Sequence, residues 1–216
     1  MTINFRNFIS KTLKFKFCFT ILKVLFSRIL LRMFSIGLRV PKWHLNATFQ
    51  ARKYKSKVIK ISNMYESNFV VEVGCGVGEI LGRVNAPHKF GIDLDKDTLL
   101  LCKRLNNNIK TFQLDIMINQ QKLLEIINLI DKEETVLIIM VNWLHAYSEK
   151  KVKKTIENLL SLNRKIIIIA DIYKRGELSR IKNNKIVHKF KDMNNYISYK
   201  EIKNIDSVRD LAILSN

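Results

Sequence analysis

An acidic residue followed by alternating glycines is the first group in this sequence with the potential for chemistry. The residues are Glu72, Gly74, Gly76 and Gly78, and they come at the end of an apolar run. Glycines let a chain turn sharply and let backbone N–H groups approach a ligand with no Cβ in the way. The dinucleotide fingerprint G-x-G-x-x-G does not fit, because its third glycine would fall at Glu79. The pattern therefore predicts a ligand-binding loop of another kind at the end of a strand.

Three further polar signals follow, each at the expected end of a strand. Asp93 comes one βαβ step after Glu72, where a carboxylate can bind ribose hydroxyls. Asp115 comes a further step on, where a carboxylate can bind an adenine amino group, and Asn142 and His145 follow a fourth apolar run. Ligands bind at the carboxyl ends of strands in open α/β sheets, so these signals predict one shared site. The alternative for a strand-end Asp is a helix cap.

The elements that must position these residues alternate along the chain from residue 69. The expected strands are 69–73, 89–93, 109–114, 136–141 and 165–170. The expected helices begin near Gly78, Lys96, Asn119, Ser148 and Gly176. Such alternation predicts an α/β fold, with a parallel sheet covered by helices on both faces. The segments 196–205 and 209–214 flank a turn and predict a closing antiparallel hairpin.

Together these motifs resemble the cofactor-binding motifs of the class I S-adenosylmethionine-dependent methyltransferases. The resemblance covers about residues 66–216. It implies a Rossmann-like seven-stranded sheet that is mostly parallel, with S-adenosylmethionine over the glycine loop. The residues implied to bind this cofactor are Glu72, Gly74, Gly76, Gly78, Asp93, Asp115 and Asn142. Lys42-Trp43-His44 and the segment 141–145 also resemble bacterial methyltransferases of polysaccharide (O-antigen or capsule) biosynthesis.

Two histidines are candidate bases for methyl transfer to a hydroxyl. His145 is expected beside the acceptor and His44 ahead of the sheet, and imidazole titrates near neutral pH. Each has a structural alternative, and for His44 this is packing with its tryptophan neighbour. Asp171 could position the acceptor or a divalent metal, but one carboxylate does not make a metal site, so no metal is predicted. The acceptor is expected beneath residues 42–65 and the loop at 173–184.

The positive charge of the chain is concentrated at its start. The net charge is +19, and no Asp or Glu occurs before Glu66. Within residues 15–40, Arg28, Arg32, Ser35 and Arg39 lie opposite a broad apolar helical face. That face is made of Phe15, Phe19, Leu22, Leu25, Phe26, Ile29, Leu30, Met33 and Ile36. No uncharged run reaches the ~18 to 20 residues of a membrane span.

We therefore expect a basic amphipathic arm, 1–41, ahead of a methyltransferase domain, 42–216, in which 42–65 form a helical cap. Within the arm, residues 11–40 are expected to contact a membrane peripherally, with the arginines at lipid head groups. A mitochondrial presequence is the alternative if the source is eukaryotic.

The expected function is S-adenosylmethionine-dependent O-methylation of a sugar, a polysaccharide or another small molecule at a membrane surface. The expected location is cytoplasmic and peripheral on the inner face of the cytoplasmic membrane. One alternative is an RNA methyltransferase whose arm grips phosphates, although an aligned apolar face favours lipid over nucleic acid. Another is a non-catalytic assembly protein with the same fold. The oligomeric state stays open.

Overall fold

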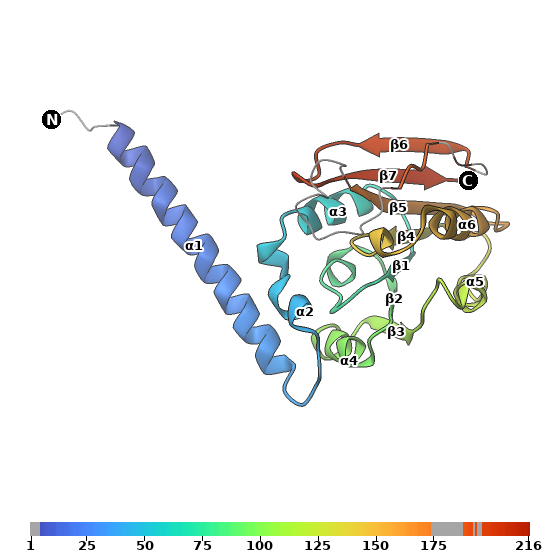
Figure 1. Ribbon diagram of the computed structural model, residues 1–216, viewed down its shortest axis with the longest axis horizontal. Coiled ribbons are helices and arrows are strands. Elements are labelled where there is room, and N and C mark those ends of the chain that lie inside the picture. The colour runs from blue at the N-terminus through green and yellow to red at the C-terminus, as the bar shows by residue number, and fades with distance from the viewer. Residues whose placement is uncertain (1–4, 174–187, 192, 194–195) are drawn as a thin grey trace.

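The computed structural model describes residues 5–173, 188–191, 193 and 196–216, and a mixed sheet forms its centre (Figure 1). The strands are β1 (Phe69–Val73), β2 (His88–Asp93), β3 (Ile109–Gln113), β4 (Val136–Met140), β5 (Ile166–Tyr173), β6 (Ser198–Ile202) and β7 (Arg209–Ser215). They form a seven-stranded sheet in the order β3-β2-β1-β4-β5-β7-β6. β1 to β5 pair in parallel, and β7 is antiparallel to both β5 and β6. The predicted Rossmann-like sheet with a C-terminal antiparallel hairpin is confirmed.

Helices precede the sheet and connect its strands. The α-helices are α1 (Phe5–Phe34), α2 (Lys42–Asn46), α3 (Tyr54–Ser62), α4 (Lys96–Leu105), α5 (Gln120–Asn128) and α6 (Glu149–Leu160). Three short 3-10 helices are η1 (Phe49–Ala51), η2 (Leu81–Arg83) and η3 (Leu144–Ala146). The helix expected near Gly78 is wrong, since only η2 forms there. The Leu81 N–H donates to the buried Glu72 carboxylate at 3.0 Å instead of to a helical carbonyl. The helix expected near Gly176 lies outside the described residues.

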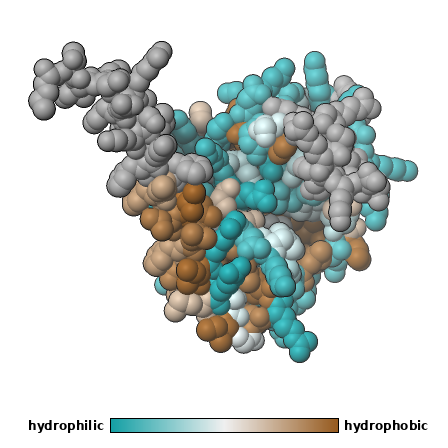
Figure 2. Space-filling view, turned by 60° about the vertical axis from the view of Figure 1, so that its left-hand side comes forward, coloured by the Kyte–Doolittle hydropathy of each residue, from teal (hydrophilic) through white to brown (hydrophobic). Residues whose placement is uncertain are grey.

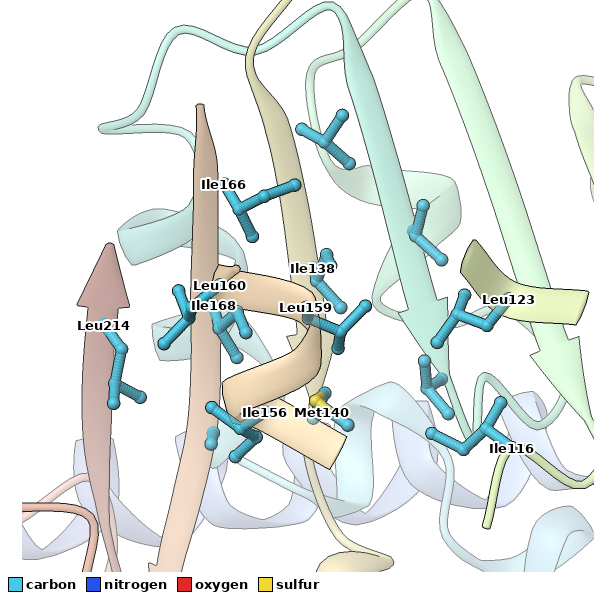
Figure 3. Packing of buried hydrophobic residues seen from close by; sticks show 14 of the residues in the cluster. Ile116, Leu123, Ile138, Met140, Ile156, Leu159, Leu160, Ile166, Ile168 and Leu214 are labelled. Atoms are coloured by element: carbon cyan, nitrogen blue, oxygen red, sulfur yellow. The ribbon is translucent and has the colours of Figure 1, made fainter. Parts of the chain in front are cut away.

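Both faces of the sheet are covered, which explains the apolar character of its central strands. Every residue of β4 is buried, as is typical of a central parallel strand. On one face Ile138 and Met140 of β4 belong to the same cluster as Ile156 of α6 (Figure 3). On the other face Ile139 belongs to a cluster with Val58 of α3. This two-sided core fixes the strand ends that carry the site.

The first helix stands apart from these layers. Figure 1 shows α1 leaning away from the sheet toward its N-terminal end, while its C-terminal end approaches α2 and α4. The helix stops shortly before Gly37, which adopts a φ of +79°. Among the described residues, no helix is long and apolar enough to cross a membrane.

Candidate active site

A pocket of about 660 Å³ lies at the carboxyl ends of the parallel strands. Gly74 follows β1, Asp93 ends β2, Asp115 follows β3 and Asn142 follows β4, and all four line this pocket. β1 and β4 are neighbours at the centre of the sheet. From β1 the chain continues to β2 and β3 on one side, and from β4 it continues to β5 on the other. Open α/β sheets bind ligands at such a switch point. The fold thus brings four of the seven predicted cofactor residues to one place.

The glycine loop is pinned to the sheet and packed under two aromatic side chains. The N–H groups of Gly74 and Cys75 both donate to the carbonyl of Ile92, at 2.8 Å and 3.0 Å. A Cβ added to Gly74 would lie 2.5 Å from Cδ1 of Trp143. A Cβ added to Gly76 would lie 2.8 Å from the ring of His44. The loop therefore needs glycine at these positions for packing as well as for its positive φ angles.

Glu72 serves this loop from beneath the pocket. It is 3% exposed and lines a smaller cavity together with His44, Lys55 and Glu79. Burial raises the pKa of Glu72 to about 8, although the Leu81 N–H opposes that shift. Lys55 forms an ion pair with Glu79 beside it. Glu72 therefore fixes the chain after the loop and does not line the larger pocket.

Asp93 and Asp115 are held by main-chain hydrogen bonds. Oδ2 of Asp93 accepts from the Gly76 N–H at 2.8 Å, and Oδ1 accepts from the Asp95 N–H at 3.1 Å. The helix cap is Asp95, which accepts from the Thr98 N–H at 2.6 Å at the start of α4. The cap alternative therefore applies to Asp95, and Asp93 faces the pocket. Oδ1 of Asp115 accepts from the backbone N–H two residues on, at 2.8 Å.

Asn142 is positioned by β5. Its φ is +74°, and its N–H donates to Oδ2 of Asp171 at 2.8 Å. Its side-chain oxygen accepts from the Tyr173 hydroxyl at 3.0 Å. Asp171 is 1% exposed, and Nη1 of Arg209 lies 3.6 Å from its Oδ2. Asp171 thus supports the loop after β4 from within the core, whereas the sequence suggested that it positions an acceptor or a metal.

Arg209 was missed from the sequence, and its neighbours Tyr54 and Tyr173 were expected only as part of the segments that cover the acceptor. The guanidinium of Arg209 lies 3.7 Å from the ring centroid of Tyr54 and 5.1 Å from that of Tyr173. Its Nε lies 2.9 Å from Oδ2 of Asp206. Arg209 and Tyr173 line the pocket, and burial raises the pKa of the Tyr173 phenol. The available signal was a lone arginine opening an apolar strand. Tyr173 was expected in the loop over the acceptor, whereas it is the last residue of β5.

The two candidate bases lie in different places. His145 lies in η3 and lines the larger pocket, with its ring centroid 4.7 Å from that of Tyr173 in an edge-on contact. His44 lies in α2 with its ring stacked on Trp43 at 3.4 Å, and it lines the smaller cavity. Burial lowers the pKa of His44 to about 4, so its ring is neutral near pH 7. The expected packing with Trp43 is present, and His145 alone of the two lines the larger pocket.

The described residues contain no group of three His, Cys, Asp or Glu side chains placed to hold a metal ion. The expected loop over the acceptor extends past Tyr173 into residues that are not described. Its other expected part, 42–65, comprises α2, η1 and α3. This segment contributes Trp43, in α2, and Arg52, between η1 and α3, to the pocket.

The fold is that of known methyltransferases. Magnesium protoporphyrin IX methyltransferase from Synechocystis PCC 6803, with bound S-adenosylhomocysteine, has a TM-score of 0.54 and 13% identity, over 76% of this chain and 84% of that one. The N-methyltransferase NodS from Bradyrhizobium japonicum WM9, also with S-adenosylhomocysteine, has a TM-score of 0.56 and 12% identity, over 81% and 91%. The methyltransferase domain of bacterial CtHen1-C has a TM-score of 0.53 and 11% identity, over 76% and 96%.

The chain has the class I methyltransferase fold. No family model matches the sequence, and no curated protein matches it. At these identities the likeness establishes the architecture alone. The polysaccharide resemblance is not confirmed, since these neighbours are similar to this chain in fold alone and none of their names mentions a polysaccharide.

Proposed function

We propose that this chain is an S-adenosylmethionine-dependent methyltransferase that methylates a hydroxyl group of a sugar, a polysaccharide or another small molecule. The observation that carries the proposal is the convergence of Gly74, Asp93, Asp115 and Asn142 on one pocket in a methyltransferase fold. The pocket volume of about 660 Å³ lies in the ordinary range for small-molecule sites.

The residues at the β1–β3 side of the pocket fit the proposed cofactor. Each oxygen of Asp93 accepts one backbone N–H and keeps a lone pair for a ribose hydroxyl. Asp115 uses one oxygen on the backbone, so the other can accept from an adenine amino group. Leu94, Leu114 and Ile116 supply the apolar wall that a flat purine needs. S-adenosylmethionine, when bound, supplies a methyl group that is already activated.

The rest of the pocket fits a small polar acceptor. Trp43, Tyr147 and Tyr173 line it together with Arg52 and His145. Aromatic walls with a few polar groups are typical of sites that orient a small molecule. The chain has to align the acceptor oxygen and remove its proton, and we assign the proton to the imidazole of His145. For His44, its place over the glycine loop favours a role in shaping that loop over the role of base.

The test is transfer of a labelled methyl group to defined acceptors. The full chain is incubated with methyl-labelled S-adenosylmethionine and separately with lipid-linked glycans, soluble sugars and RNA from the organism that carries the gene. We expect label in a glycan or sugar fraction. His145→Ala should lower the rate by ~10²–10⁴ with cofactor affinity nearly unchanged, as for a lost general base.

His88→Ala is the matched control, since His88 is exposed at the start of β2, at the end of the strand opposite the pocket. Its rate should equal that of the unaltered chain. Label in RNA alone would replace the glycan proposal by the nucleic-acid alternative. Cofactor binding with no label in any fraction would favour the non-catalytic alternative. A wild-type rate in His145→Ala would make that histidine structural.

A further inference from the structure

The outward face of α1 is an exposed apolar surface. Among residues whose side chains are described, ten large apolar side chains on α1 and just after it are at least 36% exposed. They are Phe19, Ile21, Leu22, Leu25, Phe26, Ile29, Leu30, Met33, Phe34 and Ile36. Figure 2 shows a brown to pale-brown surface on this side of the molecule. Contiguous patches of this kind mark interaction sites, whereas single exposed apolar residues do not.

The opposite face of α1 already has a partner in the domain. Leu31 is buried in a cluster with Val77 and Leu101. The Ser27 hydroxyl donates to Oγ1 of Thr48 at 3.0 Å. Arg104 of α4 donates to the carbonyl oxygens of residues 34 and 36, which ties down the C-terminal end of the helix. The ten apolar side chains therefore stay exposed although the opposite face of the helix packs on its own domain.

Two arginines of α1 are hydrogen-bonded to the end of α2. Nε of Arg28 and Nη2 of Arg32 donate to the backbone and side-chain oxygens of Asn46, both at 3.3 Å. These hydrogen bonds join α1 to the end of α2 and lie at the exposed surface, and the contact of both arginines with lipid head groups stays a prediction. Lys23 and Arg39 are exposed and keep their charge in contact with solvent.

We infer that the apolar face of α1, defined by those ten side chains, docks on an anionic phospholipid surface. The positive charge of the arm favours an anionic lipid surface over other partners. The first 65 residues carry fourteen Lys or Arg and no acid, so they complement negative head groups. A second copy of the chain would bring the same positive charge against it. Nucleic acid would match the charge but would leave the apolar side chains in water.

The geometry is that of a helix lying in the interface. No helix in the described residues can span a membrane, and a basic amphipathic helix buries one face at the boundary between head groups and acyl chains. α2 contacts α1, and its Trp43 is 59% exposed while lining the pocket. Trp is favoured at membrane interfaces. Docking would bring the Trp43 edge of the pocket close to the lipid surface. Together with the proposed function, on which this step rests, that placement favours a lipid-linked acceptor.

Flotation of the full chain with vesicles tests the docking. The vesicles are phosphatidylcholine alone, or phosphatidylcholine with phosphatidylglycerol. The arm variant is Leu22→Glu with Phe26→Glu, at side chains 62% and 63% exposed. The matched control is Ile118→Glu with Leu129→Glu, which adds the same charge at side chains 82% and 87% exposed away from α1. Circular dichroism of both variants checks that they fold.

We expect the full chain to float with the anionic vesicles and more weakly with the neutral ones. The arm variant should lose at least about tenfold in its partition coefficient, because two large apolar side chains no longer enter the lipid. The control variant should float like the unaltered chain. No flotation of the full chain, or equal flotation of both variants, would overturn the docking. The docking would also be overturned if the full chain did not float but formed a dimer, and if the arm variant were a monomer. Cofactor binding in the same samples reports on the proposed function separately.

Discussion

The two walls of the pocket are held in place by different kinds of interaction. On the wall made by β2 and β3, Asp93 and Asp115 accept backbone N–H groups two residues further along the chain. On the wall made by β5 and β7, Arg209 lies buried beside Asp171 and Asp206 and between two tyrosine rings. The first wall depends on local backbone geometry, and the second on charges that come together only in the folded chain. We therefore expect substitutions in the two walls to have effects that differ in size and in kind.

The largest expected effect is on the β5–β7 wall. Arg209→Met leaves Asp171 buried without its nearby cation, and breaking a buried ion pair from one side costs about 3–5 kcal/mol of unfolding free energy. Urea unfolding measures it. Adding Asp171→Asn to Arg209→Met should recover part of the loss. Lys103→Met, at an exposed position on α4, is the control and should change little. A loss below about 1 kcal/mol in Arg209→Met would show that this wall has another support.

The next effect tests the glycine loop that follows β1. Gly74→Ala places a Cβ 2.5 Å from the Trp143 ring at a φ of +71°. Left-handed strain and overpacking together predict a loss of roughly 2–4 kcal/mol. Gly37→Ala is the matched control, because its φ is +79° but no atom lies within 4 Å of the added Cβ. It should lose about 1–2 kcal/mol, from strain alone. Equal losses in thermal or urea unfolding would mean that the Trp143 contact carries no weight.

A pH-dependent effect comes from Glu72 beneath the loop. Burial raises its pKa from 4.5 to about 8. Between these values the unfolded carboxyl is ionised while the folded one keeps its proton, so the unfolded state binds fewer protons. Stability from this group is therefore complete below pH 4.5 and falls as pH rises toward 8, by at most about 1.4 kcal/mol per pH unit.

Glu72→Gln should flatten this dependence, since its amide oxygen can still accept the Leu81 N–H. Glu66→Gln, at an exposed glutamate, should leave the slope as it is. Urea unfolding at pH 5, 6.5 and 8 compares them. Parallel slopes in the Glu72 variant and the unaltered chain would mean that Glu72 is ionised in the fold.

The same contrast explains what the sequence could predict. The strands, Asp93 and Asp115 follow from local runs and spacing, because an apolar strand carries its polar terminal residue with it. The contacts of Arg209 and Tyr173 have no local signature, since their partners come from α3, the loop after β4 and the turn before β7. The helix expected near Gly78 failed for a related reason. The Leu81 N–H donates to the buried Glu72 carboxylate and not to a helical carbonyl, and glycine spacing alone does not reveal that bond.

Calorimetric titration with S-adenosylmethionine tests the central claim most directly. The unaltered chain should bind one molecule, and Asp93→Ala should weaken binding by about 10- to 100-fold, as for lost hydrogen bonds to a charged group. Asp95→Asn is the matched control, because Asp95 caps α4 outside the pocket, and its affinity should stay close to that of the unaltered chain. No binding by the unaltered chain, or equal affinity in Asp93→Ala, would contradict the assignment of this pocket to S-adenosylmethionine.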